Sequence, residues 1–197
     1  KNKDTYYLEI GVRNRASNFD LINANYKYSV DPAINLNDKN HFQLTSDSFF
    51  IKLKVGEILN PRIKFDVIFI DGLHLAEQVE RDIENSLDFL KNDGFILLHD
   101  CNPPSEWHAR ENYSFNYSPA LSSWNGTTWK AFFKKRLENN IYSCCIDTDW
   151  GVGVISKGTN LGKAAQIANT FFEFKKFEAN RKEHLNLISF TKFKKLL

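Results

Sequence analysis

The chain has 197 residues, of which 42% are hydrophobic and 25% charged, which is typical of one globular domain and excludes a disordered or collagen-like chain. Its formal net charge is +2, from 26 basic and 24 acidic residues, and this balance argues against a nucleic-acid partner, which requires clustered cations. No apolar run approaches the roughly 18 residues of a membrane helix and no secretion signal is recognisable, so we expect a soluble, cytoplasmic protein with a small-molecule partner.

Short apolar runs alternate with longer segments of helical period, a pattern that predicts an α/β domain with a parallel sheet. In Leu75–Lys91, apolar residues recur every three or four positions and predict one buried helical stripe. The predicted strands are Tyr6–Ile10, Tyr26–Val30, His41–Leu44, Phe65–Ile70, Gly94–Leu98, Ile141–Ile146 and Val152–Ser156. The predicted helices are Asn18–Asn23, Ser48–Leu59, Leu75–Lys91, Thr127–Asn139 and a long one from Leu161 to about Lys182.

The last two predicted strands are joined only by Asp147–Gly151, which is too short for a crossover helix and therefore predicts an antiparallel hairpin. We thus expect a Rossmann-like, doubly wound and mostly parallel sheet of seven strands that ends in this hairpin, within one domain over residues 1–197. The three cysteines, Cys101, Cys144 and Cys145, are odd in number and include an adjacent pair, which favours a reducing compartment.

Two segments stand apart from this alternation. Residues 101–124 have no clear period and collect three Pro and two Trp, which predicts an ordered lid over a substrate. Residues 161–197 combine Phe with basic residues and predict a helical tail that packs its Phe on the domain; a membrane-surface contact or a contact with a second copy is the alternative. A homo-oligomer is therefore one expected assembly.

Ligands of open α/β sheets bind beyond the carboxyl ends of the strands, so the polar residues at these ends are candidate site residues. Glu9 and Gly11 end the first strand, and Asp31 follows the second strand, 20 residues after Gly11. An acid at that distance can accept both ribose hydroxyls of a nucleoside cofactor. The alternative is a strand-ending turn with Asp31 as its cap.

The third strand leads into Ser46 and Asp47, where Asp47 is placed to accept the amino group of an adenine. Capping of the following helix by either residue is the alternative. No second glycine follows Gly11, so the G-x-G-x-x-G loop that binds a pyrophosphate is absent and NAD or FAD is disfavoured. A nucleoside cofactor without phosphate, such as S-adenosylmethionine, tolerates that loss, and Glu9 can serve its amino-acid end.

Two neighbouring strands each deliver an Asp and a His to the same edge of the sheet. Asp71 and His74 follow the fourth strand, and His99 and Asp100 follow the fifth. A carboxylate beside an imidazole can act as a general base or bind a metal, and the carboxylate oxygens of Asp71 and Asp100 suit Mg²⁺. We therefore predict His74, His99 and Asp71 as catalytic residues and Asp71 and Asp100 as ligands of a divalent ion.

Six motifs occur in an order that carries a family resemblance: Glu9–Arg13, Val30–Pro32, Ser46–Phe50, Phe65–His74, His99–Pro104 and Asp147–Ile155. Together they resemble the class I S-adenosylmethionine-dependent methyltransferases, and more closely the branch that contains small-molecule and sugar O-methyltransferases. Arg13 and Arg15 depart from the glycines that many of these enzymes have in the first loop.

The resemblance implies a cofactor site formed by Glu9, Gly11, Asp31, Ser46 and Asp47, with Asp71 at the border of the active site. It also places His74, His99 and Asp100 on the substrate side, where some relatives hold a metal or a base. We expect O-methylation of a sugar or nucleotide sugar, with S-adenosylmethionine as cofactor and Mg²⁺ as its companion ion. The alternative is a cofactor-binding but catalytically idle module that serves as an assembly partner in glycan biosynthesis.

Overall fold

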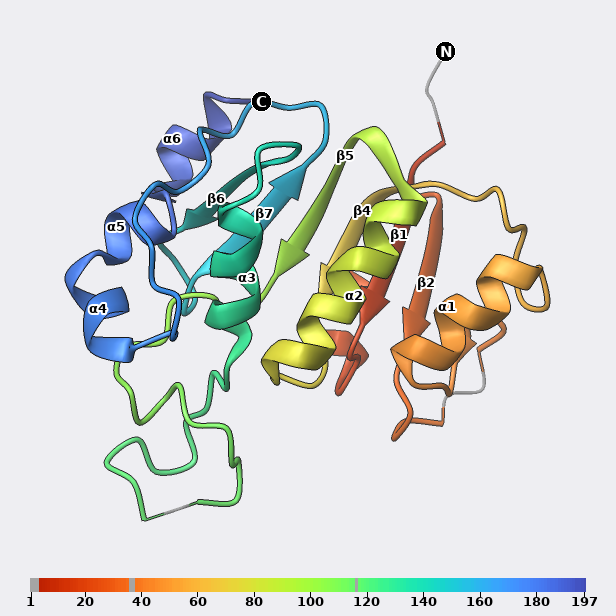
Figure 1. Ribbon diagram of the computed structural model, residues 1–197. Helices are drawn as coiled ribbons and strands as arrows, with labels where there is room; N and C mark the ends of the chain where they lie inside the picture. Colours follow the sequence, from red (N-terminus) through yellow and green to blue (C-terminus); the bar gives the residue numbers. More distant parts are fainter. Residues whose placement is uncertain (1–3, 36–37, 116) are drawn as a thin grey trace.

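The computed structural model describes residues 4–35, 38–115 and 117–197. Its described strands form one sheet with the order β3-β2-β1-β4-β5-β7-β6-β8 (Figure 1). The strands are β1 (Tyr6–Ile10), β2 (Tyr26–Val30), β3 (His41–Phe42), β4 (Phe65–Ile70), β5 (Leu90–Leu98), β6 (Tyr142–Ile146), β7 (Val152–Ser156) and β8 (Leu187–Ile188). The α-helices are α1 (Ser46–Val55), α2 (Ala76–Phe89), α3 (Thr128–Arg136), α4 (Phe174–Ala179), α5 (Arg181–His184) and α6 (Phe190–Lys194), and two 3₁₀ turns are η1 (Arg15–Ser17) and η2 (Phe19–Leu21).

The pairing of the strands confirms the predicted Rossmann-like sheet. Strands β3, β2, β1, β4 and β5 run parallel, and β7 lies antiparallel between β5 and β6. The short link between β6 and β7 therefore forms the predicted hairpin. Strand β8, which pairs parallel to β6 over two residues, was not predicted, because two residues carry no readable alternation.

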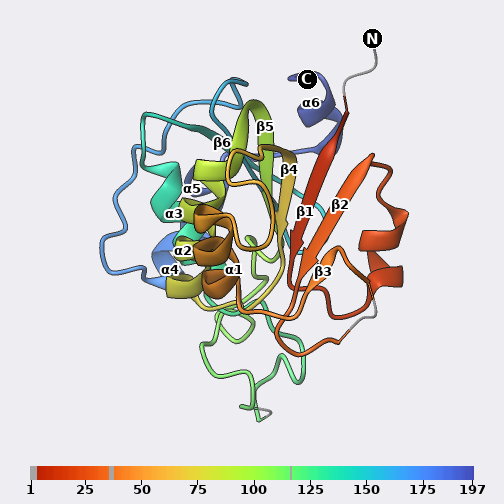
Figure 2. The ribbon, with the colours of Figure 1, turned by 90° about the vertical axis from the view of Figure 1, so that its right-hand side faces the viewer.

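Helices α1, α2 and α3 lie on one face of the sheet (Figure 2). On this face, Leu8, Ile68, Ile96 and Ile155 form one row across four neighbouring strands, and each is fully buried. This row belongs to the main hydrophobic core, together with residues of α2 and with Trp129 of α3. Removal of this apolar surface from water is the main force that fixes the helices to the sheet.

The opposite face is covered by smaller elements. Tyr7 of β1 and Phe19 of η2 form one buried cluster, and Phe193 of α6 packs on Cys144 and Val154 of β6 and β7 in another. The predicted packing of tail phenylalanines on the domain is confirmed for Phe193 here and for Phe174 and Phe177 of α4 in the main core, whereas Phe171 and Phe190 are exposed. Among the described residues, no helix has the length and apolar character needed to cross a membrane.

The predicted long helix from Leu161 to about Lys182 is wrong, because residues 161–173 have no regular structure. Their backbone groups bind elsewhere: the Ala165 N–H donates to the Arg136 carbonyl at 2.6 Å, and the Leu161 carbonyl accepts from Asn186 at 2.8 Å. Gly162 also has a φ of +130°, which no α-helix allows. The helical structure begins only at Phe174.

Four smaller predictions are corrected at element ends. In the helical stretch predicted at Asn18–Asn23, only Phe19–Leu21 are helical, as a 3₁₀ turn, and the third strand is shorter than predicted. Helix α1 ends at Val55, because Gly56 takes a left-handed conformation with a φ of +76°. Helix α2 ends at Phe89, where the chain turns directly into β5, so the strand begins four residues earlier than predicted.

Candidate functional site

The carboxyl ends of β4 and β5 lie side by side, with Ile70 paired to Leu98. Backbone hydrogen bonds continue past these ends: Asp71 N donates to Ile10 O at 2.9 Å, and His99 N donates to Ile70 O at 3.1 Å. The residues that directly follow the strands therefore have fixed positions. This explains why the polar residues after β4 and β5 meet at one edge of the sheet.

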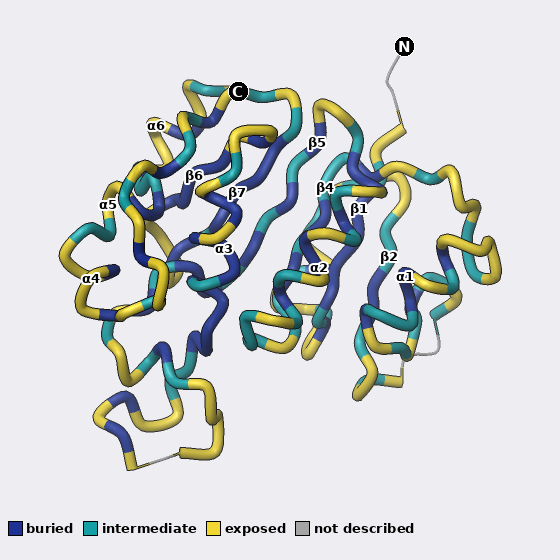
Figure 3. Tube along the Cα trace, in the orientation of Figure 1, coloured by how far each residue is buried: buried dark blue, intermediate teal, exposed yellow. Residues whose placement is uncertain are grey.

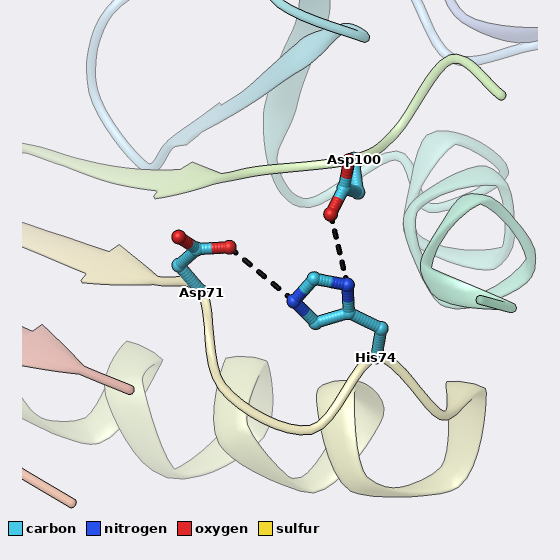
Figure 4. Close-up of side chains that lie close together, drawn as sticks. All are labelled: Asp71, His74 and Asp100. Atoms are coloured by element: carbon cyan, nitrogen blue, oxygen red, sulfur yellow. Dashed lines mark ion pairs between the residues drawn. The ribbon is translucent and has the colours of Figure 1, made fainter. Parts of the chain in front are cut away.

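The imidazole of His74 lies between two carboxylates (Figure 4). Its Nε2 is 3.3 Å from Asp71 Oδ1, and its Nδ1 is 2.8 Å from Asp100 Oδ2. His99 faces the same pair, with its Nδ1 3.3 Å from each of these two oxygens. The structure thus brings together all four residues that we predicted for chemistry or metal binding. We call them the Asp–His cluster.

Burial and charge act against each other in the Asp–His cluster. Burial disfavours the imidazolium form of each histidine, but the two adjacent carboxylates outweigh it and raise the pKa of His74 to about 9 and that of His99 to about 11. Burial likewise disfavours the carboxylates, and the two histidines lower the pKa of Asp71 and of Asp100 below the usual value. Without another cation, the carboxylates therefore hold both histidines in their protonated form near neutral pH.

The residues of the Asp–His cluster fit a divalent cation. Ligand atoms of Asp71, His74 and Asp100 lie within 4.8 Å of one another. Within the described chain, the Nδ1 atoms of His74 and His99 are buried and have no aligned hydrogen bond, although carboxylate oxygens lie near them. The two hard carboxylate oxygens suit Mg²⁺ or Mn²⁺, and the imidazole nitrogen is a ligand that transition metals also accept.

The segment that precedes α3 supports the Asp–His cluster from the other side. Asn125 is fully buried and its Nδ2 donates to Asp100 Oδ1 at 2.7 Å. Trp124 stacks on the His74 ring with 5.2 Å between centroids and 6° between planes. Gly126 has a φ of +61° and lies so close to His74 that a Cβ atom would be 2.1 Å from the His74 carbonyl oxygen. Sequence reasoning did not predict a role for Asn125, and no local pattern distinguishes it.

The hairpin loop between β6 and β7 adds a further polar group, Asp149. Asp149 Oδ2 is 3.1 Å from His99 Nε2. Three consecutive residues, Asp149, Trp150 and Gly151, have φ values of 44°, 58° and 88°. This conformation is held by hydrogen bonds from Cys101 N to Gly151 O at 2.9 Å and from Asn102 N to Trp150 O at 2.7 Å. The loop is therefore fixed to the exit of β5.

The predicted lid, residues 101–124, contains no helix or strand among its described residues. It extends beyond the edge at which β1, β4 and β5 end (Figure 1), and most of it is exposed (Figure 3). It is nevertheless ordered by Arg110, which donates to the carbonyls of Ser123 at 2.8 Å and Leu121 at 2.9 Å, and by Trp124 Nε1, which donates to the Arg110 carbonyl at 2.7 Å.

The end of β1 lies directly against Asp71. Gly11 has a φ of +89°, and a Cβ atom there would be 2.3 Å from the Asp71 carbonyl oxygen, so only glycine allows this approach. Glu9 is buried, and its Oε2 accepts from the Tyr7 hydroxyl at 2.5 Å and from Asn18 Nδ2 at 2.8 Å. Burial raises the pKa of Glu9. Its cofactor role stays a prediction.

The other predicted cofactor residues lie at the ends of β2 and at the start of α1. Asp31 Oδ1 accepts from Ala33 N at 2.8 Å, so the turn that we considered as the alternative does form. The alternative role of Ser46 or Asp47 as the cap of α1 is wrong. Thr45 caps this helix, because its side chain accepts from Ser48 N at 3.2 Å.

Helix α2 supplies the partners of Ser46 and Asp47. Gln78 Nε2 donates to Ser46 Oγ at 3.1 Å and to Asp82 Oδ1 at 2.9 Å, and Arg81 Nε lies 3.3 Å from Asp47 Oδ2. We did not predict these contacts of Gln78 and Asp82 from the sequence, because the helical period of α2 identifies only its apolar face. A ligand at the start of α1 would thus contact side chains that α2 holds in place.

Comparisons with known proteins agree with this fold. Residues 12–101 match the family model described as a methyltransferase domain. This match spans 90 of the 197 residues, and together with the mostly parallel sheet and its β7 insertion it identifies residues 12–101 as part of a methyltransferase domain with the class I fold. The comparison with curated proteins finds no match.

Three solved structures illustrate the likeness. An O-methyltransferase from Bacillus cereus in complex with S-adenosylhomocysteine is 16% identical over 78% of this chain and 74% of that chain, with a TM-score of 0.50. The MycE methyltransferase of the mycinamycin biosynthetic pathway, in complex with Mg, S-adenosylhomocysteine and mycinamycin VI, is 15% identical over 80% of this chain and 46% of that chain, with a TM-score of 0.49. A putative O-methyltransferase from Klebsiella pneumoniae is 15% identical over 79% of this chain and 74% of that chain, with a TM-score of 0.47. The chain spans about half the length of the MycE chains.

Proposed function

We propose that this domain transfers a methyl group from S-adenosylmethionine to a hydroxyl group of a small molecule, with a sugar as the acceptor class. The convergence of the Asp–His cluster at the carboxyl edge of a methyltransferase sheet is the observation that carries the proposal. In open α/β folds this edge is where ligands bind, and paired carboxylates and imidazoles there serve proton transfer.

The cofactor would lie across the ends of β1, β2 and β4. Asp31 would accept the ribose hydroxyls, Asp47 the adenine amino group, and Glu9 would act on the amino-acid end through the network that it forms with Tyr7 and Asn18. Gly11 lets the β1 loop approach this edge without a side chain. When bound, S-adenosylmethionine supplies an electrophilic methyl group on a sulfonium.

The residues of the Asp–His cluster would prepare the acceptor hydroxyl. Once a divalent ion offsets the charge of the two carboxylates, either His74 or His99 would be neutral and would take the proton of this hydroxyl at a ring nitrogen, and Asp71 would orient that ring. Asp71 and Asp100, with His74 as a further ligand, would hold a divalent ion, which would supply the positive charge that offsets these carboxylates. The loop 101–124 would exclude water, since its Trp124 already covers one face of His74.

The proposal is tested first by titration calorimetry of the full chain with S-adenosylhomocysteine, and then by methyl transfer from labelled S-adenosylmethionine to a panel of sugars with Mg²⁺ or EDTA. We expect binding of S-adenosylhomocysteine and transfer that EDTA abolishes. Asp100→Asn should lose transfer. The matched control is Asp88→Asn, which removes an exposed carboxylate that pairs with Lys54 at 3.2 Å near the end of α2.

Two results would contradict the proposal. Absence of S-adenosylhomocysteine binding would refute a cofactor site at the ends of β1 and β2. Binding without transfer to any acceptor of the panel would favour the alternative, a catalytically idle module that acts as an assembly partner.

A further inference from the structure

A cleft of about 460 Å³ lies beside the Asp–His cluster. Its walls are the β6–β7 hairpin loop, the residues that follow β5, and the region of α4 and α5. Asp149 belongs to this wall and also lies 3.1 Å from His99 Nε2. A molecule in the cleft would therefore contact Asp149, which connects the cleft to the imidazole of His99.

The charges on the walls of the cleft are mostly negative. Asp147, Asp149 and Glu178 are exposed carboxylates, and Arg181 is the cation among the lining residues. One nitrogen of the Arg181 guanidinium is already bonded, since Nη1 donates to Asn102 Oδ1 at 2.5 Å and to the Pro103 carbonyl at 2.7 Å. The cleft therefore offers hydrogen-bond acceptors and has an unfavourable potential for anions.

An indole adds an apolar surface to these acceptors. Trp150 lines the cleft, and its side chain is 40% exposed. Its backbone has a φ of +58° and is fixed by the hydrogen bond from Asn102 N, so the ring is held at the cleft by the hairpin itself. A fixed aromatic ring beside carboxylates is suited to a molecule that has an apolar C–H face and hydroxyl groups at its edge.

We infer that this cleft binds the acceptor, and that the acceptor is a sugar ring that carries no phosphate. The inference rests on the proposed methyltransferase function and narrows its substrate class. Ring hydroxyls would donate to Asp147, Asp149 and Glu178, and the C–H face would pack on Trp150. The diphosphate of a nucleotide sugar would instead meet three carboxylates and a single guanidinium whose Nη1 is already bonded.

The test uses ¹⁹F NMR of the full chain labelled with 5-fluorotryptophan. The chain has four Trp, and Trp150→Phe identifies the Trp150 resonance by its loss. S-adenosylhomocysteine is added to saturation, followed by methyl glycosides of neutral hexoses in one series and the matching uridine diphosphate sugars in another. We expect the glycosides to shift the Trp150 resonance and the nucleotide sugars to leave it unchanged at equal concentration.

Variants then test the walls of the cleft. Glu178→Gln and Asp147→Asn should each weaken glycoside binding by about tenfold, as expected for a lost hydrogen bond to a charged group. Glu183→Gln, an exposed carboxylate on α5 outside the cleft, is the control and should bind like the unmodified chain. Trp150→Ala should reduce glycoside binding measured by saturation-transfer NMR while the affinity for S-adenosylhomocysteine is retained.

The experiment distinguishes failure of the acceptor inference from failure of the proposed function. If S-adenosylhomocysteine binds but no glycoside shifts Trp150, or if nucleotide sugars bind more tightly than glycosides, the acceptor inference is overturned and the proposed function is not. If S-adenosylhomocysteine itself does not bind, the proposed function fails and the acceptor inference fails with it.

Discussion

Asp82, on α2, provides a quantitative test of how burial affects a carboxyl group near the start of α1. Its carboxylate is buried, with a relative exposure of 1%, and accepts from Gln78 Nε2 at 2.9 Å. Burial raises the pKa of Asp82 from 3.8 to about 6, although hydrogen bonds from Ser46 and Gln78 lower it in part. The folded protein therefore favours the neutral acid, and ionisation at neutral pH destabilises it.

The magnitude follows from the shift in pKa. Because the pKa is higher in the folded than in the unfolded chain, the favourable contribution of the neutral acid is complete below about pH 4 and is lost as the pH rises through about 6. A shift of about two units corresponds to about 3 kcal/mol in the free energy of unfolding. Asp82→Asn removes this penalty but loses one acceptor, which costs about 1 kcal/mol. We expect the variant to be about 2 kcal/mol more stable than the unmodified chain at pH 8.

Urea unfolding at pH 8 and near pH 4.5 measures this difference. The advantage of Asp82→Asn should shrink or reverse at the lower pH, where Asp82 is largely protonated in the folded chain. Asp88→Asn, which changes an exposed carboxylate of the same helix, is the control and should show little pH-dependent difference from the unmodified chain. A stability difference for Asp82→Asn that does not depend on pH, or a variant that is less stable at pH 8, would refute the reasoning.

Three further substitutions have defined outcomes. Asn125→Ala removes the 2.7 Å hydrogen bond to buried Asp100 and should lower the free energy of unfolding by about 1.5–3 kcal/mol; an unchanged urea midpoint would contradict the role of Asn125. Gly11→Ala places a Cβ atom 2.3 Å from the Asp71 carbonyl oxygen, so it should lower the melting temperature and abolish S-adenosylhomocysteine binding in calorimetry. Retained binding would show that the loops after β1 and β4 can separate. Trp129→Ala empties a fully buried core position and should cost about 3–5 kcal/mol in urea unfolding, and a loss below about 1 kcal/mol would show that the core refills the space.

The order of elements could be read from the sequence because most of its signals are local. The strands that end at Ile10, Val30 and Ile70 are short runs rich in aromatic and branched apolar residues, and the five-residue link at Asp147–Gly151 permits only a hairpin. The long helix predicted from Leu161 was wrong because the contacts of this segment are not local. Its backbone groups bind Arg136 and Asn186, and no local pattern reveals partners that are distant in the sequence.

The same distinction applies to the candidate site. The sequence by itself determined that Asp71, His74, His99 and Asp100 would meet, because parallel neighbouring strands deliver the residues after their carboxyl ends to one edge of the sheet.

Only the tertiary structure decided which groups surround this cluster. Trp124 and Asn125 reach it because Thr127 N donates to the His74 carbonyl at 2.7 Å and Asn125 N donates to the His108 carbonyl at 3.0 Å. Asp149 reaches it because the hairpin loop is bonded to the exit of β5. These are backbone contacts between segments 17 to 53 residues apart, as the numbering of each bonded pair gives, and their geometry is fixed only once the sheet has formed.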